Sequence, residues 1–176
     1  TLDQARRMAA HLQSLALPPG ARIAMLAKNS AHFFMAELAI WMAGGTTVAI
    51  YPTELAETVR YVLEHSEASL LFVGKLDTWE QQEPGVPAGL PCIALPLSPP
   101  TTFETWDAII ARTPPLTGRP SRAGTDLAIS DREVRVILAM AHDQALGGDG
   151  RYARPRLLDD DWRGVRLRQP ICCTAT

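Results

Sequence analysis

Short apolar runs alternate with amphipathic segments over the first 112 residues of the chain. Three of these runs are bounded by turn-forming residues and predict buried strands, and a weaker fourth run follows them. We expect these strands at residues 22–27, 46–50, 69–73 and 92–95. Because the runs are continuously apolar, they favour parallel strands that are covered on both faces of a sheet.

The amphipathic segments between these runs predict helices that cross over the sheet. Pro18-Pro19-Gly20 is expected to stop the first helix, and Asn29-Ser30 is expected to supply the cap of the second. The second helix should end at Gly44-Gly45, where a left-handed residue is tolerated. Thr53 is expected to cap the third helix, with Glu54 and Glu57 in its first turn.

The alternating order of strands and helices predicts an α/β fold, with a layered parallel sheet and flanking helices. We expect residues 1–112, which end in a helix over about 103–112, to form this partial domain. Residues 113–128 are expected to be a linker and the start of the next strand, since prolines and glycines are frequent there. Residues 129–176 look unrelated to the rest. We expect a poorly ordered tail with one helix over 131–145.

Composition narrows the classes of function. The chain has 176 residues, 47% of them hydrophobic, and a formal net charge of −2, which excludes the basic excess of nucleic-acid-binding proteins. Its longest apolar stretch, residues 31–43, is shorter than the ~20 residues that span a bilayer. Cys92, Cys172 and Cys173 provide neither a disulfide framework nor a zinc-binding spacing. We therefore expect a cytoplasmic protein without a metal site.

Several residues have both a functional and a structural interpretation. Gly74-Lys75 follows a strand, but the upstream glycines and the following Ser or Thr of a phosphate loop are missing, which favours a turn. His32 and His65 are candidate acid–base groups, yet neither has a recognisable nucleophile beside it. The apolar residues of 33–42 suit an acyl pocket or, more simply, a buried core. Asp159-Asp160-Asp161 suits solvated carboxylates. We predict no catalytic, cofactor-binding or metal-binding residue.

Residues 21–74 resemble the early N-terminal domain of acyl-CoA synthetases. More narrowly, they are similar to the long-chain fatty acid–CoA ligase branch of the adenylate-forming (AMP-binding) superfamily. The resemblance rests on an ordered series of short motifs in this stretch: Lys28-Asn29-Ser30, Gly44-Gly45, Tyr51-Pro52-Thr53 and His65-Ser66-Glu67-Ala68. A weaker likeness covers residues 1–20, as the preceding helix, and residues 101–128, as the stretch that leads to the nucleotide loop.

The resemblance implies a complete enzyme that binds ATP, magnesium and a fatty acid, forms an acyl-adenylate, and transfers the acyl group to coenzyme A. Its phosphate-binding loop is rich in Ser, Thr and Gly and ends in a lysine. That loop is expected directly after Ala128, but the sequence continues with Ile129-Ser130-Asp131-Arg132-Glu133, and the only lysines, Lys28 and Lys75, lie upstream. We therefore expect a chain truncated before the nucleotide loop, which binds no cofactor itself and is catalytically incompetent.

Two alternatives stay open at this point. A frameshift, a gene fusion or a partial record would each explain the change of character near Ala128, and the DNA around codon 128 would distinguish them. The alternative function is a small α/β binding or partner-pairing module without catalysis. The sheet edge that lacks its usual following strands would then favour self-association.

Overall fold

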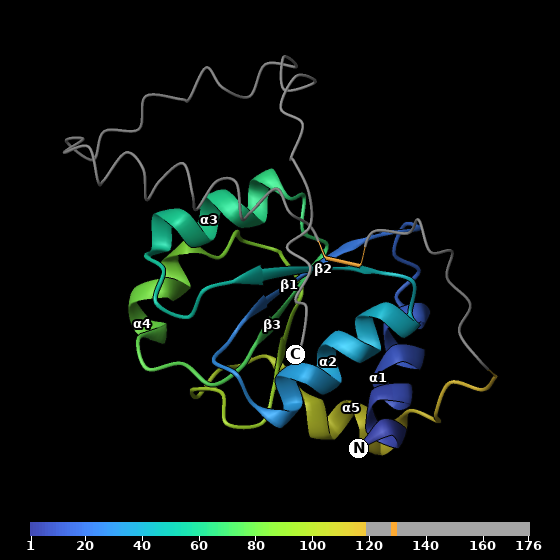
Figure 1. Cartoon of the computed structure of the whole chain (residues 1–176). Helices are drawn as coiled ribbons and strands as arrows, with labels where there is room; N and C mark the ends of the chain where they lie inside the picture. Colours follow the sequence, from blue (N-terminus) through green and yellow to red (C-terminus); the bar gives the residue numbers. More distant parts are fainter. Residues whose placement is uncertain (119–127, 130–176) are drawn as a thin grey trace, which may run out of the picture. The chain divides into compact units, whose positions relative to one another are not determined.

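The computed structural model describes residues 1–118 and 128–129, so the helix predicted over 131–145 and the predicted tail lie outside the described residues. In the described part, five parallel strands form one sheet in the order β2-β1-β3-β4-β5 (Figure 1). The strands are β1 (Arg22–Leu26), β2 (Thr46–Ile50), β3 (Leu70–Val73), β4 (Cys92–Ala94) and β5 (Glu104–Thr105). The predicted layered parallel sheet is confirmed.

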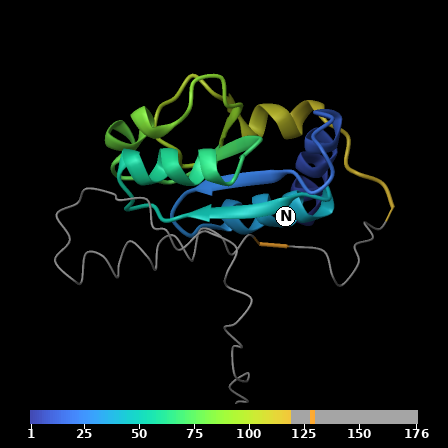
Figure 2. The ribbon, with the colours of Figure 1, turned by 90° about the horizontal axis from the view of Figure 1, so that it is seen from above.

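The helices cover both faces of the sheet (Figure 2). One face carries α1 (Leu2–Ser14), α2 (Ala31–Met42) and α5 (Trp106–Arg112). The opposite face carries α3 (Ala56–His65) and α4 (Trp79–Gln82), and the short 3-10 helix η1 (Glu83–Gly85) follows α4.

Alternating side chains of each strand enter two separate cores. Ile23 and Met25 of β1 pack with α1, α2 and α5, whereas Ala24 and Leu26 pack with α3 and α4. Since successive side chains of a strand point to opposite faces, a strand between two helical layers has to be apolar at every position. This requirement explains the continuous apolar runs of the sequence.

The helix ends follow local sequence signals in α2. The Ser30 side chain accepts a hydrogen bond from the Phe33 backbone N–H at 3.2 Å, which satisfies a free donor of the first turn. After the helix, Gly44 has a φ of +87°, a conformation that glycine adopts without a steric cost. The predicted cap and the predicted end of this helix are both confirmed.

The predicted start of the third helix is wrong. α3 begins at Ala56 with Leu55 as its N-cap, so Thr53 caps nothing and Glu54 precedes the helix. The reason is a long-range contact, because the buried Gln82 side chain holds the carbonyl groups of Pro52 and Glu54 in an irregular segment.

The last predicted helix is shorter than the pattern indicated. Glu104 and Thr105 pair with β4 as strand β5, and α5 starts only at Trp106. The Thr105 hydroxyl accepts a hydrogen bond from the Ala108 backbone N–H at 3.3 Å and so marks the boundary. The parallel pairing with β4 takes the residues that the sequence pattern assigned to the first turn.

After α5 the chain lies along α1. The Arg6 guanidinium donates hydrogen bonds to the carbonyl groups of Leu116 and Gly118, each at 3.1 Å. The Leu116 backbone N–H donates in return to the Arg6 carbonyl at 3.0 Å. Where the described chain resumes, Ile129 forms a parallel bridge with Thr47 of β2.

Candidate functional site

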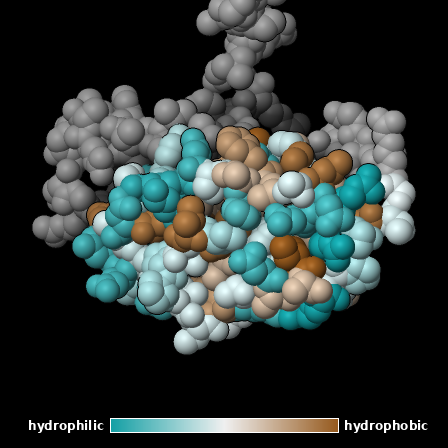
Figure 3. Space-filling model, turned by 90° about the horizontal axis from the view of Figure 1, so that it is seen from below, coloured by the Kyte–Doolittle hydropathy of each residue, from teal (hydrophilic) through white to brown (hydrophobic). Residues whose placement is uncertain are grey.

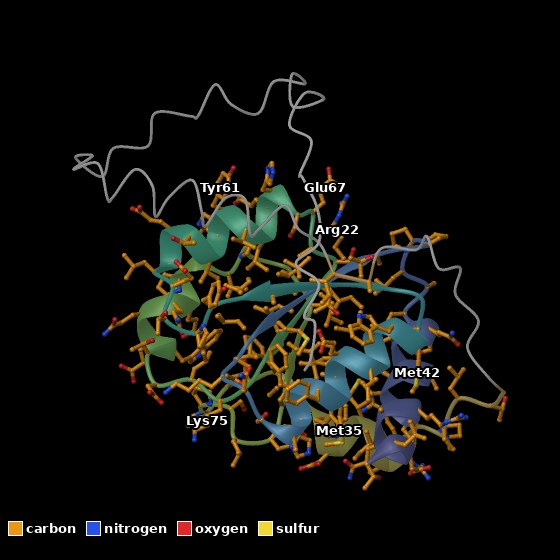
Figure 4. The ribbon with its side chains drawn as sticks, viewed as in Figure 1. Arg22, Met35, Met42, Tyr61, Glu67 and Lys75 are labelled. Carbon is orange, nitrogen blue, oxygen red and sulfur yellow. The ribbon has the colours of Figure 1, made fainter. Side chains whose placement is uncertain are left out.

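The candidate site lies where β1, β2 and β3 end. Ligands of open parallel α/β sheets bind outside the carboxyl ends of the strands. Figure 4 shows this end of the sheet by the position of Lys75, with Arg22 at the opposite end. A shallow pocket of about 160 Å³, here called the carboxyl-edge pocket, lies among the loops that leave these strands. It is lined by Lys28, Pro52, Thr53, Glu54, Leu55, Asp77, Thr78, Gln81 and Gln82.

An ion pair occupies one side of the carboxyl-edge pocket. The Lys28 ammonium donates a hydrogen bond to the Asp77 carboxylate, and the Lys28 backbone N–H donates to the Lys75 carbonyl at 2.9 Å. The hydrogen bond from Lys28, together with its charge, lowers the pKa of Asp77, and the charge of Lys75 adds a smaller effect. An anionic ligand would have to compete with Asp77 for Lys28.

The floor of the pocket is fixed by Gln82, which is only 1% exposed. Its Nε2 group donates to the Pro52 carbonyl at 2.9 Å and to the Glu54 carbonyl at 3.0 Å. Its Oε1 atom has no hydrogen-bond partner among the described residues. Gln82 therefore joins the loop after β2 to α4 and sets the pocket's shape.

Gly74 and Lys75 form no phosphate cradle. Gly74 is buried, and a Cβ atom built on it would lie 2.6 Å from the Cβ of Ala27, so the glycine allows the ends of β1 and β3 to approach closely. Lys75 is exposed and offers its backbone carbonyl to Lys28. A structural role for this glycine agrees with the turn that the sequence favoured.

The structure does not bring His32 and His65 together, since they lie on helices that cover opposite faces of the sheet. His32 contacts Trp106 edge-on, with ring centroids 5.9 Å apart. His65 stacks on Tyr61 of the same helix, with ring centroids 5.3 Å apart. Tyr61 points away from the sheet on the outer side of α3 (Figure 4). Neither histidine lines the carboxyl-edge pocket.

The apolar residues of α2 divide between the core and the surface. Phe33, Met35, Trp41 and Met42 are partly buried against the core beneath α1 and α5. Phe34 points outward and is 57% exposed. None of the five lines the carboxyl-edge pocket, so the geometry gives no acyl site at this helix.

The described part of the chain contains no group of three potential metal ligands. None of its helices has the length and apolarity needed to cross a membrane. Asp159-Asp160-Asp161, Cys172 and Cys173 lie outside the described residues. Burial raises the pKa of the Cys92 thiol to about 11, so this cysteine is protonated at neutral pH and unsuited to act as a nucleophile.

Sequence reasoning missed the residues that α4 and the loop before it contribute to the pocket, Asp77 and Gln82 among them. α4 has only four residues, which is too short for a helical period to be visible in the sequence. The opposite charges of Lys28 and Asp77 are visible in the sequence. No local pattern indicates that two residues so far apart in sequence form an ion pair.

Replacing Lys28 with methionine is expected to raise the pKa of Asp77 toward its ordinary value, because the hydrogen bond and the charge that lower it are lost. A lowered carboxyl pKa contributes stability above the unfolded-state pKa, and this contribution is lost as the pH falls through the folded-state value. A ¹³C NMR titration of the Asp77 carboxyl measures the shift. Lys75→Met is the control, and a change as large as that of Lys28→Met would contradict the assignment.

The family model described as AMP-binding enzyme matches residues 1–107. The long-chain-fatty-acid–CoA ligase FadD15 of Mycobacterium bovis is 39% identical over 70 residues, which are 40% of this chain and 12% of that protein. Tyrocidine synthase 2 of Brevibacillus parabrevis is 35% identical over 69 residues, which are 39% of this chain and 2% of that protein.

A solved structure shows the same fold. The benzoate CoA ligase of Burkholderia xenovorans superimposes with a TM-score of 0.60 at 21% sequence identity, covering 73% of this chain and 26% of that chain. The aligned regions thus span about an eighth of the fatty-acid ligase and about a quarter of the benzoate ligase.

Proposed function

The chain belongs to the AMP-binding enzyme family, and we propose that it is the N-terminal part of an AMP-forming fatty acid–CoA ligase that is catalytically incompetent by itself. The complete enzyme would couple a fatty acid to coenzyme A through an acyl-adenylate, with ATP and magnesium. A cytoplasmic location is part of the same proposal. The single observation that carries it is the family match over residues 1–107, which ends before the position expected for the nucleotide loop.

The fatty-acid assignment is supported by the 39% identity to a long-chain-fatty-acid–CoA ligase and by the motifs between residues 21 and 74. The 35% identity to a tyrocidine synthase over a stretch of similar length means that such a likeness is not confined to fatty-acid ligases. We therefore propose the acyl substrate class from sequence likeness alone and assign no residue to acid recognition.

The carboxyl-edge pocket does not fit a nucleoside triphosphate such as ATP. Its volume of about 160 Å³ is smaller than the ~300 Å³ typical of the smallest ligand sites. Its lysine is paired with Asp77, and the described residues include no cluster of ligands for a magnesium ion. These features support the proposed incompetence, and no step of the reaction is assigned to this pocket.

The purified chain is expected to catalyse no ATP–pyrophosphate exchange above background with saturated fatty acids of 8 to 18 carbons. The physical reason is that the pocket offers no phosphate cradle and that Asp77 already neutralises its lysine, which leaves the triphosphate charge without an offset there. Full-length FadD15 of M. bovis, under identical conditions, serves as the positive control. Exchange that rises with the concentration of this chain would contradict the proposed incompetence.

A second experiment tests the ligase assignment itself. In a chimera, the segment of the M. bovis ligase that matches this chain is replaced by the matching residues of this chain. If the two segments are equivalent folding units, the chimera should keep at least one-tenth of the parent kcat. A chimera that folds but lacks all activity would count against the assignment.

The alternative function is a partner-pairing module without catalysis. It is favoured by one specific observation on the outer edge of β2. Beyond the bridge of Thr47 with Ile129, this edge pairs with no strand among the described residues, and Ala49 is exposed in a strand that is otherwise buried. Self-association through this edge is the simplest form of the alternative, since an unpaired strand edge can bind a further strand.

A further inference from the structure

Residues 113–118, here called the strap, follow α5 directly. The strap begins at the end of that helix, where the Thr113 hydroxyl donates a hydrogen bond to the Ile109 carbonyl at 2.7 Å. Pro114 and Pro115 come next and have no N–H group to donate, so they cannot continue the helix or form a full strand ladder. The position of the strap therefore has to come from contacts with other elements.

Two arginines of α1 supply these contacts. Arg6 donates to the carbonyl groups of Leu116 and Gly118, each at 3.1 Å. Arg7 donates to the Thr113 carbonyl at 3.0 Å. Hydrogen bonds from a charged donor are stronger than those between neutral groups. Half of the carbonyl groups of the strap thus receive a strong hydrogen bond from the N-terminal helix.

The second arginine is oriented by its own helix. The Asp3 carboxylate, one turn earlier in α1, accepts a hydrogen bond from Nε of Arg7 at 2.8 Å. The Nη1 group of the same guanidinium donates to the Thr113 carbonyl. A planar guanidinium that is already held on one side loses less freedom when it binds a further acceptor. Arg7 is therefore prepared to bind the strap.

Apolar contacts hold the strap less firmly than they hold the sheet. Leu116 is partly buried against the core, whereas Pro114, Thr117 and Gly118 are exposed. The surface seen from below shows apolar residues in patches between polar ones, not as one continuous apolar face (Figure 3). A segment with few buried apolar contacts opens locally at a lower free energy than the core does. The strap thus has the properties of a segment that opens by itself.

We propose that α1 is a latch for the strap: Arg6 and Arg7 keep it closed on the domain, and it opens as a local unit while the sheet stays folded. With the strap closed, the chain leaves the domain beside α1, at Gly118. With the strap open, the chain leaves at Arg112, and six extended residues add up to about 20 Å of reach. This device is independent of the ligase assignment, since it concerns only how the domain is joined to the chain that follows it.

Amide hydrogen exchange of the full chain, followed by NMR, tests the closed state. The Leu116 N–H donates to the Arg6 carbonyl at 3.0 Å and reports on the strap. The Leu71 N–H donates to the Pro91 carbonyl at 2.9 Å and reports on the sheet. We expect Leu116 to exchange roughly ten-fold or more slower than an unstructured peptide, and roughly ten-fold or more faster than Leu71. Exchange of Leu116 at the unstructured rate, or at the rate of Leu71, would overturn the proposal.

The role of the guanidinium groups is tested by Arg6→Met, which removes two hydrogen bonds and keeps an unbranched side chain. It should raise the exchange rate of Leu116 by about five-fold or more and leave that of Leu71 within about two-fold. Arg60→Met is the matched control, because Arg60 of α3 also donates to a backbone carbonyl, that of Pro84, on the opposite face of the sheet. It should leave the exchange rate of Leu116 within about two-fold.

Three outcomes of this comparison would contradict the latch. An unchanged Leu116 rate in Arg6→Met would show that the arginine does not hold the strap. Equal acceleration of Leu116 and Leu71 would show that the strap does not open as a local unit. An effect of Arg60→Met on Leu116 as large as that of Arg6→Met would show that the effect is not specific to α1.

The additional reach is tested by the distance between spin labels on α1 and on the strap. Gln13→Cys and Thr117→Cys carry the labels at exposed positions, in a chain whose own cysteines are replaced by serine. Dipolar electron-spin spectroscopy should give a narrow distance distribution for this chain. The double substitution Arg6→Met and Arg7→Met should add a broader component at longer distances. A distribution that this double substitution leaves unchanged would overturn the role of the two arginines.

Discussion

Replacing Trp106 with alanine is expected to destabilise the fold by about 3–5 kcal/mol, the range for truncating a large aromatic residue in a core. Trp106 is fully buried. Its ring lies 5.9 Å from that of His32 and 6.4 Å from that of Phe72, so it joins α5 to α2 and β3. Because domains of this size are stable by only about 5–15 kcal/mol, urea unfolding followed by circular dichroism should show a large fall in midpoint.

Trp106→Phe is the matched control for this substitution. The indole N–H of Trp106 has no hydrogen-bond partner among the described residues, so phenylalanine loses ring volume but no hydrogen bond. We expect about 1–2 kcal/mol of destabilisation, well below the alanine value. Phe34→Ala, at a side chain that is 57% exposed, should change the free energy of unfolding by less than about 0.5 kcal/mol. Equal losses for all three variants would contradict the assigned role of Trp106.

Gly85→Ala is expected to cost about 3 kcal/mol or more in the free energy of unfolding, near or above the upper end of the range for overpacking. A Cβ atom at Gly85 would lie 2.2 Å from the backbone carbonyl oxygen of Ala56, the first residue of α3. Backbone atoms at a helix start cannot turn away as a flexible side chain does, so η1 and α3 would have to separate. Urea unfolding measures this loss directly.

The matched control for Gly85 is Glu83→Ala, since Glu83 is exposed in the same 3-10 helix. Its expected effect is within about 0.5 kcal/mol. A Gly85→Ala variant with unchanged stability would show that η1 and α3 adjust without cost. Amide NMR shifts around Pro52 and Glu54 would locate any such adjustment, because α4 and the pocket loop are joined by Gln82.

The strands could be located from the sequence because their burial leaves a local signal. A parallel strand between two helical layers is largely apolar. β3 is apolar throughout, β1 after Arg22 and β2 after Thr47. The start of α3, in contrast, carried a misleading local signal. Thr53 and Glu54 form a good local helix start, but the contact of their segment with Gln82 overrides that preference.

The candidate site was less accessible to sequence reasoning. Lys28, Asp77 and Gln82 belong to three different segments, and only the parallel sheet brings their loops to one edge. Gly74 looked like part of a phosphate loop, although its role is to let two strands approach each other. Such roles depend on neighbours that are distant in the chain and leave no periodic pattern.

The sequence by itself determined the family resemblance, the parallel α/β class and the absence of any lysine after Lys75. These features are carried by the order and the types of residues, which need no tertiary information. Only the tertiary structure decided that Lys28 is paired with Asp77, that Gln82 fixes the pocket, and that Gly74 lies where β1 and β3 approach closely. These facts arise from long-range packing and hydrogen bonding, whose energies depend on distances that a linear pattern does not contain.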